Sequence, residues 1–204
     1  MGVAERRARE KEELRAEILN SAAELFLKEG YQNVSMRKIA DRIEYAPSTI
    51  YLYFKDKAEL CQTICVETFE KLTAELKGIA RLGLPPEEEL RRSLRSYIEF
   101  GLGHPQEYLF TFCTPAPVGD EFSQGNFDAV MKSGMEAFDL LRKGLSTCMA
   151  VGVIRTQNVE LAAQLVYAMI HGLTSLLVLN CGFPFLEREV LIDGLIDHVV
   201  RGLK

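Results

Sequence analysis

Hydroxyl and cationic side chains cluster in the N-terminal third of the chain, at a spacing suited to binding phosphate. Ser35 is predicted to cap a short helix, where its hydroxyl and the free backbone N–H groups can meet an anion. Arg37 follows two residues later, and Lys55 and Lys57 flank the end of a further short helix. Cationic groups beside a helix N-terminus form the kind of surface that holds a sugar–phosphate backbone. This region is therefore the first candidate for chemistry in the chain.

Two short helices joined by a tight turn must position these side chains. The spacing predicts helices over 36–43 and 47–53, with Pro47 in the first turn of the second helix. A helix over 4–29 precedes them, and another over 57–76 follows. This is the helix-turn-helix layout, in which the second short helix lies in the major groove of DNA. Four apolar side chains are predicted to form the core behind these helices, namely Ile39, Ala40, Ile50 and Phe54.

Charge indicates a local rather than a general affinity for nucleic acid. Lysine and arginine number 24 against 29 acidic residues, so the chain has a net charge of -5 at pH 7. Residues 31–57 nevertheless hold five cations and three acids. An acidic body with a slightly basic end would meet DNA by that end. The extension over 1–13 interleaves Arg6, Arg7 and Arg9 with four glutamates, which favours a solvated helix, and phosphate or minor-groove contact is the alternative.

The rest of the chain also carries helical signals, and no strict alternation of apolar and polar residues indicates a strand. Helices are predicted over 87–102, 105–112, 127–150, 159–179 and 186–203, with a loop over 114–126. Gly83 to Pro86 breaks the chain and is a candidate domain seam. We predict an all-α protein with a helix-turn-helix domain over 1–57 and a larger helical domain over 58–204.

The stretch from Leu161 to Leu186 is uncharged and long enough to span a membrane. Gln164, His171 and Asn180 interrupt it, so a helix buried in a core or between two subunits fits better, and we predict no membrane span. The N-terminus lacks the apolar segment of a signal peptide. The five cysteines are odd in number and scattered, which does not suit a disulfide framework. We therefore expect a reducing, cytoplasmic location.

The sequence between residues 22 and 60 resembles the TetR family of bacterial transcriptional regulators. The similarity lies in Ser35-Met36-Arg37-Lys38-Ile39-Ala40 and in Ala46-Pro47-Ser48-Thr49-Ile50-Tyr51-Leu52-Tyr53-Phe54-Lys55-Asp56-Lys57-Ala58-Glu59-Leu60. Ala22-Ala23-Glu24-Leu25-Phe26 and Gly30-Tyr31 also match the first helix of that family. Further along, Tyr167 and His171-Gly172 resemble the W…HG motif of one subgroup, with tyrosine at the tryptophan position.

The resemblance implies a homodimer that binds a palindromic operator in double-stranded DNA. The DNA contacts that it implies are Ser35, Arg37, Tyr45, Pro47, Ser48, Thr49, Tyr51, Leu52, Tyr53, Lys55 and Lys57. Two residues depart from the family pattern. Glu44 stands where glycine is usual, so it adopts a different turn or is strained, and Ala46 lacks the usual side-chain cap of the next helix.

The resemblance also implies that the larger domain binds a small-molecule effector and forms the dimer. Dimerisation is predicted through helices 159–179 and 186–203, packed against their copies in a four-helix bundle. A mostly apolar pocket is predicted on the middle helices, lined by Phe100, Tyr108, Phe112, Met131, Met135, Phe138, Tyr167 and His171. For each of these residues, ordinary core packing is the alternative. The predicted function is a repressor released from its operator by an apolar or aromatic effector.

Other classes of function find less support in the sequence. The three histidines, His104, His171 and His198, stand in no catalytic motif, so we predict that the chain is not an enzyme. Cys61 and Cys65 lie four residues apart without further ligands at metal spacing, so we predict no metal site and no cofactor. A redox role for these two thiols stays open. A DNA-binding regulator without a small-molecule ligand is the alternative function.

Overall fold

The computed structural model describes residues 2–115, 122–155, 158–180 and 182–204. Within these ranges the chain is helical with no β-strand, which confirms the predicted all-α class. Cys181 and part of the predicted loop over 114–126 lie outside the described residues. The chain divides into two compact units: unit 1 is Met1–Thr68 with Gln106–Met131, and unit 2 is Phe69–Pro105 with Lys132–Lys204.

Unit 1 is organised by the apolar face of α1 (Val3–Glu29). Ile18, Ala22 and Phe26 recur at helical spacing on that face, and all three are buried in one hydrophobic cluster. The predicted core residues join the same cluster, which confirms that prediction for Ile39, Ala40, Ile50 and Phe54. Because burial of an isoleucine or phenylalanine side chain contributes about 1.5–3 kcal/mol, this shared face fixes where the following short helices lie.

Local signals set the starts of the two short helices. α2 (Met36–Arg42) begins at Ser35, whose Oγ accepts a hydrogen bond from the backbone N–H of Lys38 at 3.2 Å. The predicted cap is therefore confirmed, and such a cap contributes about 1 kcal/mol. α3 (Pro47–Tyr51) begins with Pro47, a residue that suits the first turn because the N–H it lacks would have no partner in the helix.

A segment far along the sequence completes the core of unit 1. α6 (Pro105–Tyr108) leads into one π-helical turn, η2 (Leu109–Cys113), where a continuous helix over 105–112 was predicted. Phe110 of this turn is buried, and its ring stacks on Phe26 with the ring centroids 5.3 Å apart. The wider turn brings an aromatic ring from η2 onto α1.

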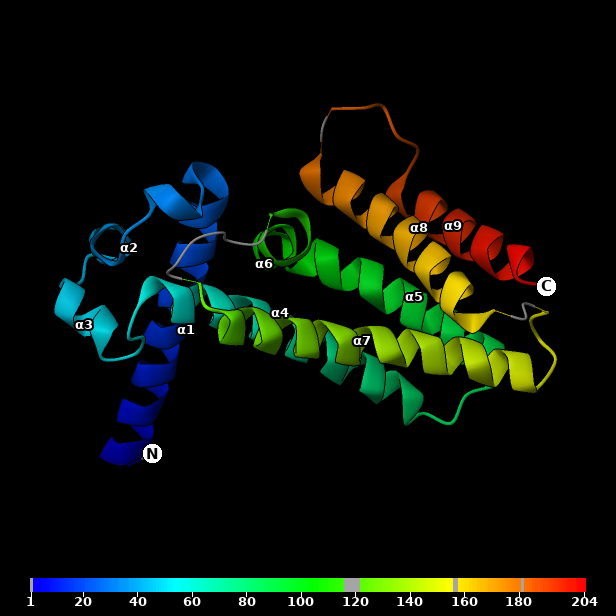
Figure 1. Ribbon diagram of the computed structural model, residues 1–204, viewed down its shortest axis with the longest axis horizontal. Helices are drawn as coiled ribbons and strands as arrows, with labels where there is room; N and C mark the ends of the chain where they lie inside the picture. The colour runs from blue at the N-terminus through cyan, green and yellow to red at the C-terminus, as the bar shows by residue number, and fades with distance from the viewer. Residues whose placement is uncertain (1, 116–121, 156–157, 181) are drawn as a thin grey trace. The chain divides into compact units, whose positions relative to one another are not determined.

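Unit 2 packs α5 (Pro86–Gly103) against α8 (Val159–Leu179) and α9 (Arg188–Gly202) (Figure 1). Parts of α4 (Lys57–Ala80) and α7 (Gln124–Ala150) belong to the same unit. The buried apolar residues of α5, α8 and α9 include Leu94, Ile98, Val166, Ile170, Ile192 and Ile196. The three helices were predicted within two residues of their observed ends.

Ion pairs line the outer edge of the contact between α5 and α9. Arg91 Nη1 lies 2.6 Å from Asp197 Oδ1, and Arg95 Nη1 lies 3.0 Å from Glu189 Oε2. Arg95 also contacts Asp193 on the next turn of α9. Ion pairs at a protein surface contribute at most about 1 kcal/mol each, so the stability of this contact comes mainly from the apolar residues. The ion pairs instead help to set which turns of α9 face α5.

The predicted domain seam at Gly83 to Pro86 is wrong. These residues lie inside unit 2 and connect α4 to α5. Gly83 has a φ of +65°, a left-handed conformation that glycine adopts without strain, so the break is a turn between two helices of one unit. The domain division into 1–57 and 58–204 remains a prediction about function, because α4 contributes residues to both compact units.

Glu44 sits in the turn between α2 and α3 with a φ of 60°. We expected Glu44 either to adopt a different turn or to be strained. The turn keeps its left-handed conformation, so Glu44 is strained. The backbone N–H of Tyr45 donates to the carbonyl oxygen of Ala40 at 3.0 Å, and this bond holds the turn closed. A side chain in the left-handed region costs roughly 1–2 kcal/mol relative to the right-handed one.

Replacing Glu44 by glycine should stabilise the protein. The relief of roughly 1–2 kcal/mol is partly offset by about 0.4–1 kcal/mol of extra freedom in the unfolded chain, so the free energy of unfolding should rise by about 0.5–1 kcal/mol. Urea denaturation followed by circular dichroism measures it. The matched variant Gly30→Ala places a Cβ at a φ of 82° and should lower stability. A loss of stability in Glu44→Gly would contradict the assignment of strain.

Candidate DNA interface and effector cavity

Large apolar side chains are exposed on α3 and directly beside it, together with the polar side chain of Ser48. Ile50 is fully buried in the core of unit 1, whereas the next residues turn outward: Tyr51 is 54% exposed and Leu52 is 81% exposed. Tyr45, in the turn before α3, is also exposed. Exposed apolar side chains on a five-residue helix have no packing role within unit 1. They are suited to contact base edges and thymine methyl groups in a major groove.

Exposed cations flank α3 on both sides. The Arg37 side chain is 82% exposed, and its Nε lies 4.0 Å from Asp41 Oδ2. The Lys55 Nζ lies 3.9 Å from Asp56 Oδ2, and that side chain is exposed as well. Ion pairs this long and this exposed contribute little, so either cation can exchange its carboxylate for a phosphate.

Lys57 differs because unit 1 itself holds its side chain. Its Nζ donates a hydrogen bond to the carbonyl oxygen of Tyr31 at 3.0 Å and lies 4.2 Å from the centroid of the Tyr31 ring. Tyr31 belongs to the single 3-10 turn η1 (Tyr31–Asn33) that follows α1. The role of Lys57 as a phosphate contact stays a prediction. A lysine already ordered in this way would lose less side-chain entropy on binding.

One shallow hollow brings several of the predicted phosphate contacts together. It is lined by Gln32, Val34, Ser35, Met36, Tyr51, Lys55, Asp56, Lys57 and Ala58. The start of α2, the end of α3 and the start of α4 therefore meet at one place on unit 1. Sequence reasoning missed Gln32, because it lies in η1 outside both short helices. Four further predicted contacts do not line this hollow and range from exposed to half-buried, namely Pro47, Ser48, Thr49 and Tyr53.

Two cations counted toward the basic region are engaged with acids of α1. Lys38 forms an ion pair with Glu29, and Arg42 Nη2 lies 3.1 Å from Glu24 Oε2. The positive charge available for phosphate therefore lies mainly at Arg37, Lys55 and Lys57. Arg37 lies in the first turn of α2, and Lys55 and Lys57 follow the end of α3.

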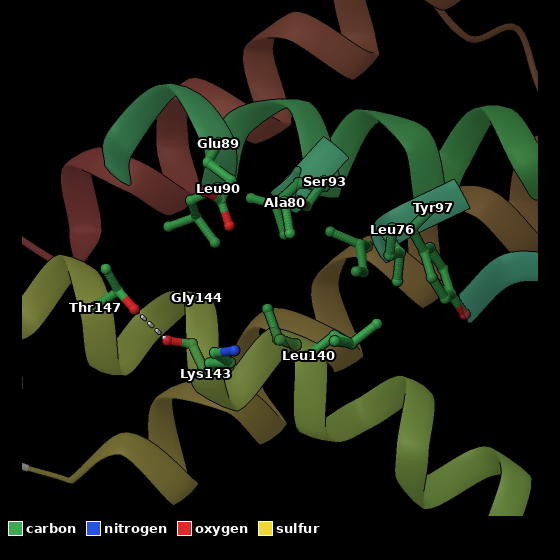
Figure 2. Close-up of a pocket in the computed structure, with 13 residues that line it drawn as sticks. Leu76, Ala80, Glu89, Leu90, Ser93, Tyr97, Leu140, Lys143, Gly144 and Thr147 are labelled. Atoms are coloured by element: carbon green, nitrogen blue, oxygen red, sulfur yellow. Dashed lines mark hydrogen bonds between the residues drawn. The ribbon is translucent and has the colours of Figure 1, made fainter. Parts of the chain in front are cut away.

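Unit 2 contains a cavity of about 260 Å³ between α4, α5, α7 and α8 (Figure 2). Its lining residues are Leu76, Ala80, Glu89, Leu90, Ser93, Leu94, Tyr97, Leu140, Leu141, Lys143, Gly144, Thr147 and Ile170. Leucine predominates, and a few polar residues stand among the apolar ones, as in small-molecule sites. None of the eight residues predicted to bind an effector lines this cavity.

The predicted effector residues are distributed differently. Met131 and Met135 are exposed, because the stripe that they form on α7 faces outward and the cavity wall begins one turn later. Phe100 and Tyr108 are buried as core residues. Phe112 is half-buried in unit 1. As effector contacts, these residues stay predictions without support from the cavity.

Phe138, Tyr167 and His171 instead form an aromatic cluster with Tyr97. The Tyr167 ring meets Tyr97 and Phe138 edge to face, with centroids 6.2 Å and 6.1 Å apart, and stacks on His171 at 5.5 Å. The hydroxyl of Tyr97 lies 3.4 Å from His171 Nδ1. Burial lowers the pKa of His171, so its ring is neutral at pH 7. Tyr97 joins this cluster to the cavity wall.

The cysteines of the described chain form no metal site. Cys61 and Cys65 are buried in unit 1, and the described residues contain no group of three His, Cys, Asp or Glu side chains that could hold an ion. A hydrogen bond with Cys65, together with burial, raises the pKa of the Cys61 thiol, and the same hydrogen bond lowers the pKa of Cys65. Cys113 is exposed, and partial burial raises its pKa also.

A helix-turn-helix with exposed apolar residues on its second helix and cations on either side defines a DNA-binding protein. Comparison with known families agrees. The profile described as "Bacterial regulatory proteins, tetR family" matches residues 18–64, and "Tetracyclin repressor-like, C-terminal domain" matches residues 90–203. The second match alone spans more than half of the chain. The chain belongs to the TetR family of transcriptional regulators, which confirms the resemblance seen in the sequence.

Individual relatives are similar over differing lengths. YhgD of Bacillus subtilis, an uncharacterized HTH-type transcriptional regulator, is 25% identical over 187 residues, which cover 91% of this chain and 94% of YhgD. The HTH-type transcriptional repressor KstR of Mycolicibacterium smegmatis is 33% identical over 38% of each chain. The structure of the regulator FadR from B. subtilis in complex with stearoyl-CoA superposes with a TM-score of 0.76, covering 93% of this chain and 100% of FadR, at 19% identity. That structural likeness shows a shared fold.

Replacing Leu52 by alanine should weaken DNA binding without destabilising the protein. Leu52 is exposed, so its truncation removes no core packing, and the lost contact with DNA should cost about 1 kcal/mol, or roughly fivefold in affinity. Fluorescence anisotropy with a labelled operator fragment measures the change. Leu82→Ala, an exposed leucine in unit 2, is the matched control and should bind as the wild type does. Equal affinities for both variants would remove Leu52 from the interface.

Proposed function

We propose that this chain is a ligand-responsive repressor, released from a palindromic operator by a small apolar or aromatic effector. The observation that carries the proposal is the cavity of unit 2: a leucine-lined space of about 260 Å³ in a chain whose other unit is a helix-turn-helix. A cavity lined mainly by apolar side chains is costly to keep unless a ligand fills it. The name of the similar repressor KstR supports the direction of regulation.

The dimensions of the cavity favour a small effector. Ligand sites commonly span about 300–1,000 Å³, so this cavity lies near the lower limit. FadR of B. subtilis holds stearoyl-CoA in its structure, a molecule far larger than this space. We infer that the effector here is a compact molecule, such as a short acyl chain or a single aromatic ring. Polar residues in the lining, including Ser93 and Thr147, would orient it.

The effector and DNA would be coupled through α4. This helix begins at Lys57, beside the predicted phosphate contacts, and its residues Leu76 and Ala80 line the cavity. An effector that shifts the later turns of α4 would move its start as well, because a helix moves largely as a rigid element. A difference of about 1–3 kcal/mol between the two states in their affinity for effector is typical of such coupling.

The proposal includes a homodimer formed through α8 and α9. Exposed leucines recur along α8 at helical spacing, at Leu161, Leu165, Leu176 and Leu179. A two-fold dimer would present two copies of α3 to successive major grooves, which is why the operator should be palindromic. α8 is also long and apolar enough to cross a membrane, and 28% of its most apolar stretch is buried. One such helix is weak support for a membrane span, and a subunit interface accounts for the same exposed face.

The first experiment is selection of genomic DNA fragments by the purified protein at near-physiological salt, followed by footprinting. A short protected palindrome near a promoter would support the proposal, and a reporter gene would separate repression from activation. Weak binding to every fragment that disappears as salt rises would contradict it, because that pattern is typical of non-specific phosphate contact.

Replacing Gly144 by leucine should fill the cavity and abolish the response to ligand. Gly144 lines the cavity, and a Cβ added there meets only Leu90, at 4.0 Å. The rise in melting temperature that a single-ring probe such as toluene produces should be lost in the variant, while binding to the operator is kept. Gly78→Leu is the matched control, since Gly78 is a helical glycine outside the cavity with open space around it.

Ligand screening of the wild type distinguishes the proposed function from the alternative, a DNA-binding regulator without a small-molecule ligand. If the wild type binds a palindrome, and no screened small molecule shifts its melting temperature or its DNA affinity, the chain is a regulator without a ligand. Equal shifts of melting temperature by the probe in Gly144→Leu and Gly78→Leu would mean that the cavity is not a binding site.

Replacing Leu176 by arginine should break the dimer. The substitution would place a charge within the apolar stripe of α8, and desolvation of an unpaired charge costs several kcal/mol. Sedimentation velocity should show a monomer for Leu176→Arg and a dimer for Leu82→Arg, which alters an exposed leucine of unit 2 away from α8 and α9. A dimer for both variants would move the interface elsewhere.

A further inference from the structure

The first turns of α1 project from unit 1 without covering any core. Residues 4–13 are all exposed, and the first buried residue of the apolar face is Ile18 (Figure 1). Short isolated helices are marginal in water, so these turns depend on the anchored part of α1. These three solvated turns add nothing to the stability of the core. Any role they have must therefore come from their exposed, charged side chains.

The four cations on these turns differ in whether they have an acidic partner. Arg6 Nε lies 3.4 Å from Glu10 Oε1, and Arg9 Nε lies 3.5 Å from Glu13 Oε1, so these two arginines have acidic partners on their own helix. Arg7 and Lys11, four residues apart, share another face. Within the part of the chain that the structure describes, neither has a carboxylate at ion-pair distance.

The face of Arg7 and Lys11 continues the face that packs on the core. Arg7, Lys11, Leu14 and Ile18 follow at intervals of four, three and four residues, which places them on one stripe of α1. The stripe therefore looks toward the same side of α1 as α2 and α3. Lys11 Nζ lies 6.0 Å from the ring centroid of Tyr53, two residues beyond the end of α3. Arg7 stands one turn further out, about 6 Å beyond Lys11 along the helix.

We propose that Arg7 and Lys11 bind the sugar–phosphate backbone of double-stranded DNA just outside the segment that α3 reads. This inference rests on the proposed function, since it requires α3 to lie in a major groove. Lys11 is already beside the end of α3, and Arg7 reaches further along the same direction, where the flanking backbone would run. Glu13 lies on another side of α1, and Glu10, which borders the stripe three residues from Arg7, is paired with Arg6. Sequence alone shows equal numbers of acids and bases over 1–13, and the structure shows which of these cations have an acidic partner.

The test compares two double variants that remove the same charge from different faces. Arg7→Ala/Lys11→Ala removes the stripe, and Arg6→Ala/Arg9→Ala removes the paired arginines. Both lose two cations, so any effect of net charge at long range is shared. Affinity of the full chain for a footprinted operator with native flanks is measured from 50 to 200 mM KCl, after circular dichroism has shown equal helix content.

The expected result is a change in salt dependence confined to the first variant. Each phosphate contact contributes about 0.9 to the slope of log K against log salt, so losing two contacts should lower the slope by about 1.8. Both affinities should fall as salt rises from 50 to 200 mM. The factor by which the wild-type affinity falls should be about twelve times the factor for Arg7→Ala/Lys11→Ala. The slope for Arg6→Ala/Arg9→Ala should stay close to the wild-type value.

A second measurement uses the same proteins on a duplex trimmed to the palindrome. The difference between the two variants should disappear, because the phosphates that Arg7 and Lys11 contact are gone. Equal slopes for the two variants on the long duplex would overturn this inference and leave the proposed function intact. A wild type that selects no DNA sequence would overturn both.

Discussion

The conformation of α3, the second helix of the helix-turn-helix, depends on one buried side chain. α3 has five residues, far fewer than an isolated helix needs in water, so its conformation comes from packing. Ile50 supplies that packing by entering the cluster formed with Phe26 and Phe54. Because Ile50 faces inward, Tyr51 and Leu52 must face outward. The outward face of α3 is therefore a consequence of how the core is closed, and a substitution behind α3 could alter DNA binding without touching DNA.

Features of unit 1 that arise within a few residues were predictable. The cap at Ser35, the proline at the start of α3 and the buried isoleucines all act locally, and the structure has them where the sequence placed them. The end of α3 was predicted two residues too late. The backbone N–H groups of Tyr53 and Phe54 both donate to the carbonyl oxygen of Ile50, so the chain turns there. Competition for one acceptor is not visible in residue types.

The cavity of unit 2 was not predictable in the same way. A stripe of Met131, Met135 and Phe138 indicates a helix with an apolar side, but it does not say which neighbours that side meets. The cavity exists where volume is missing, around Ala80 and Gly144, and small residues give no periodic signal. The positive charge predicted around α3 was too high for a related reason. Lys38 and Arg42 meet acids of α1 that lie 9 and 18 residues earlier in the chain, and only the fold brings them together.

The ring of Phe110 on Phe26 has a consequence for how regulators of this kind can diversify. The DNA-reading unit is interrupted in the sequence, since residues 106–131 belong to it and are separated from the first 68 by helices of unit 2. A recombination event that exchanged only the first part of the gene would join α1 to a foreign aromatic turn. The new pair would have to fit a stack with 5.3 Å between centroids. The exchange of operator specificity between such regulators is therefore constrained by a segment that lies outside the helix-turn-helix.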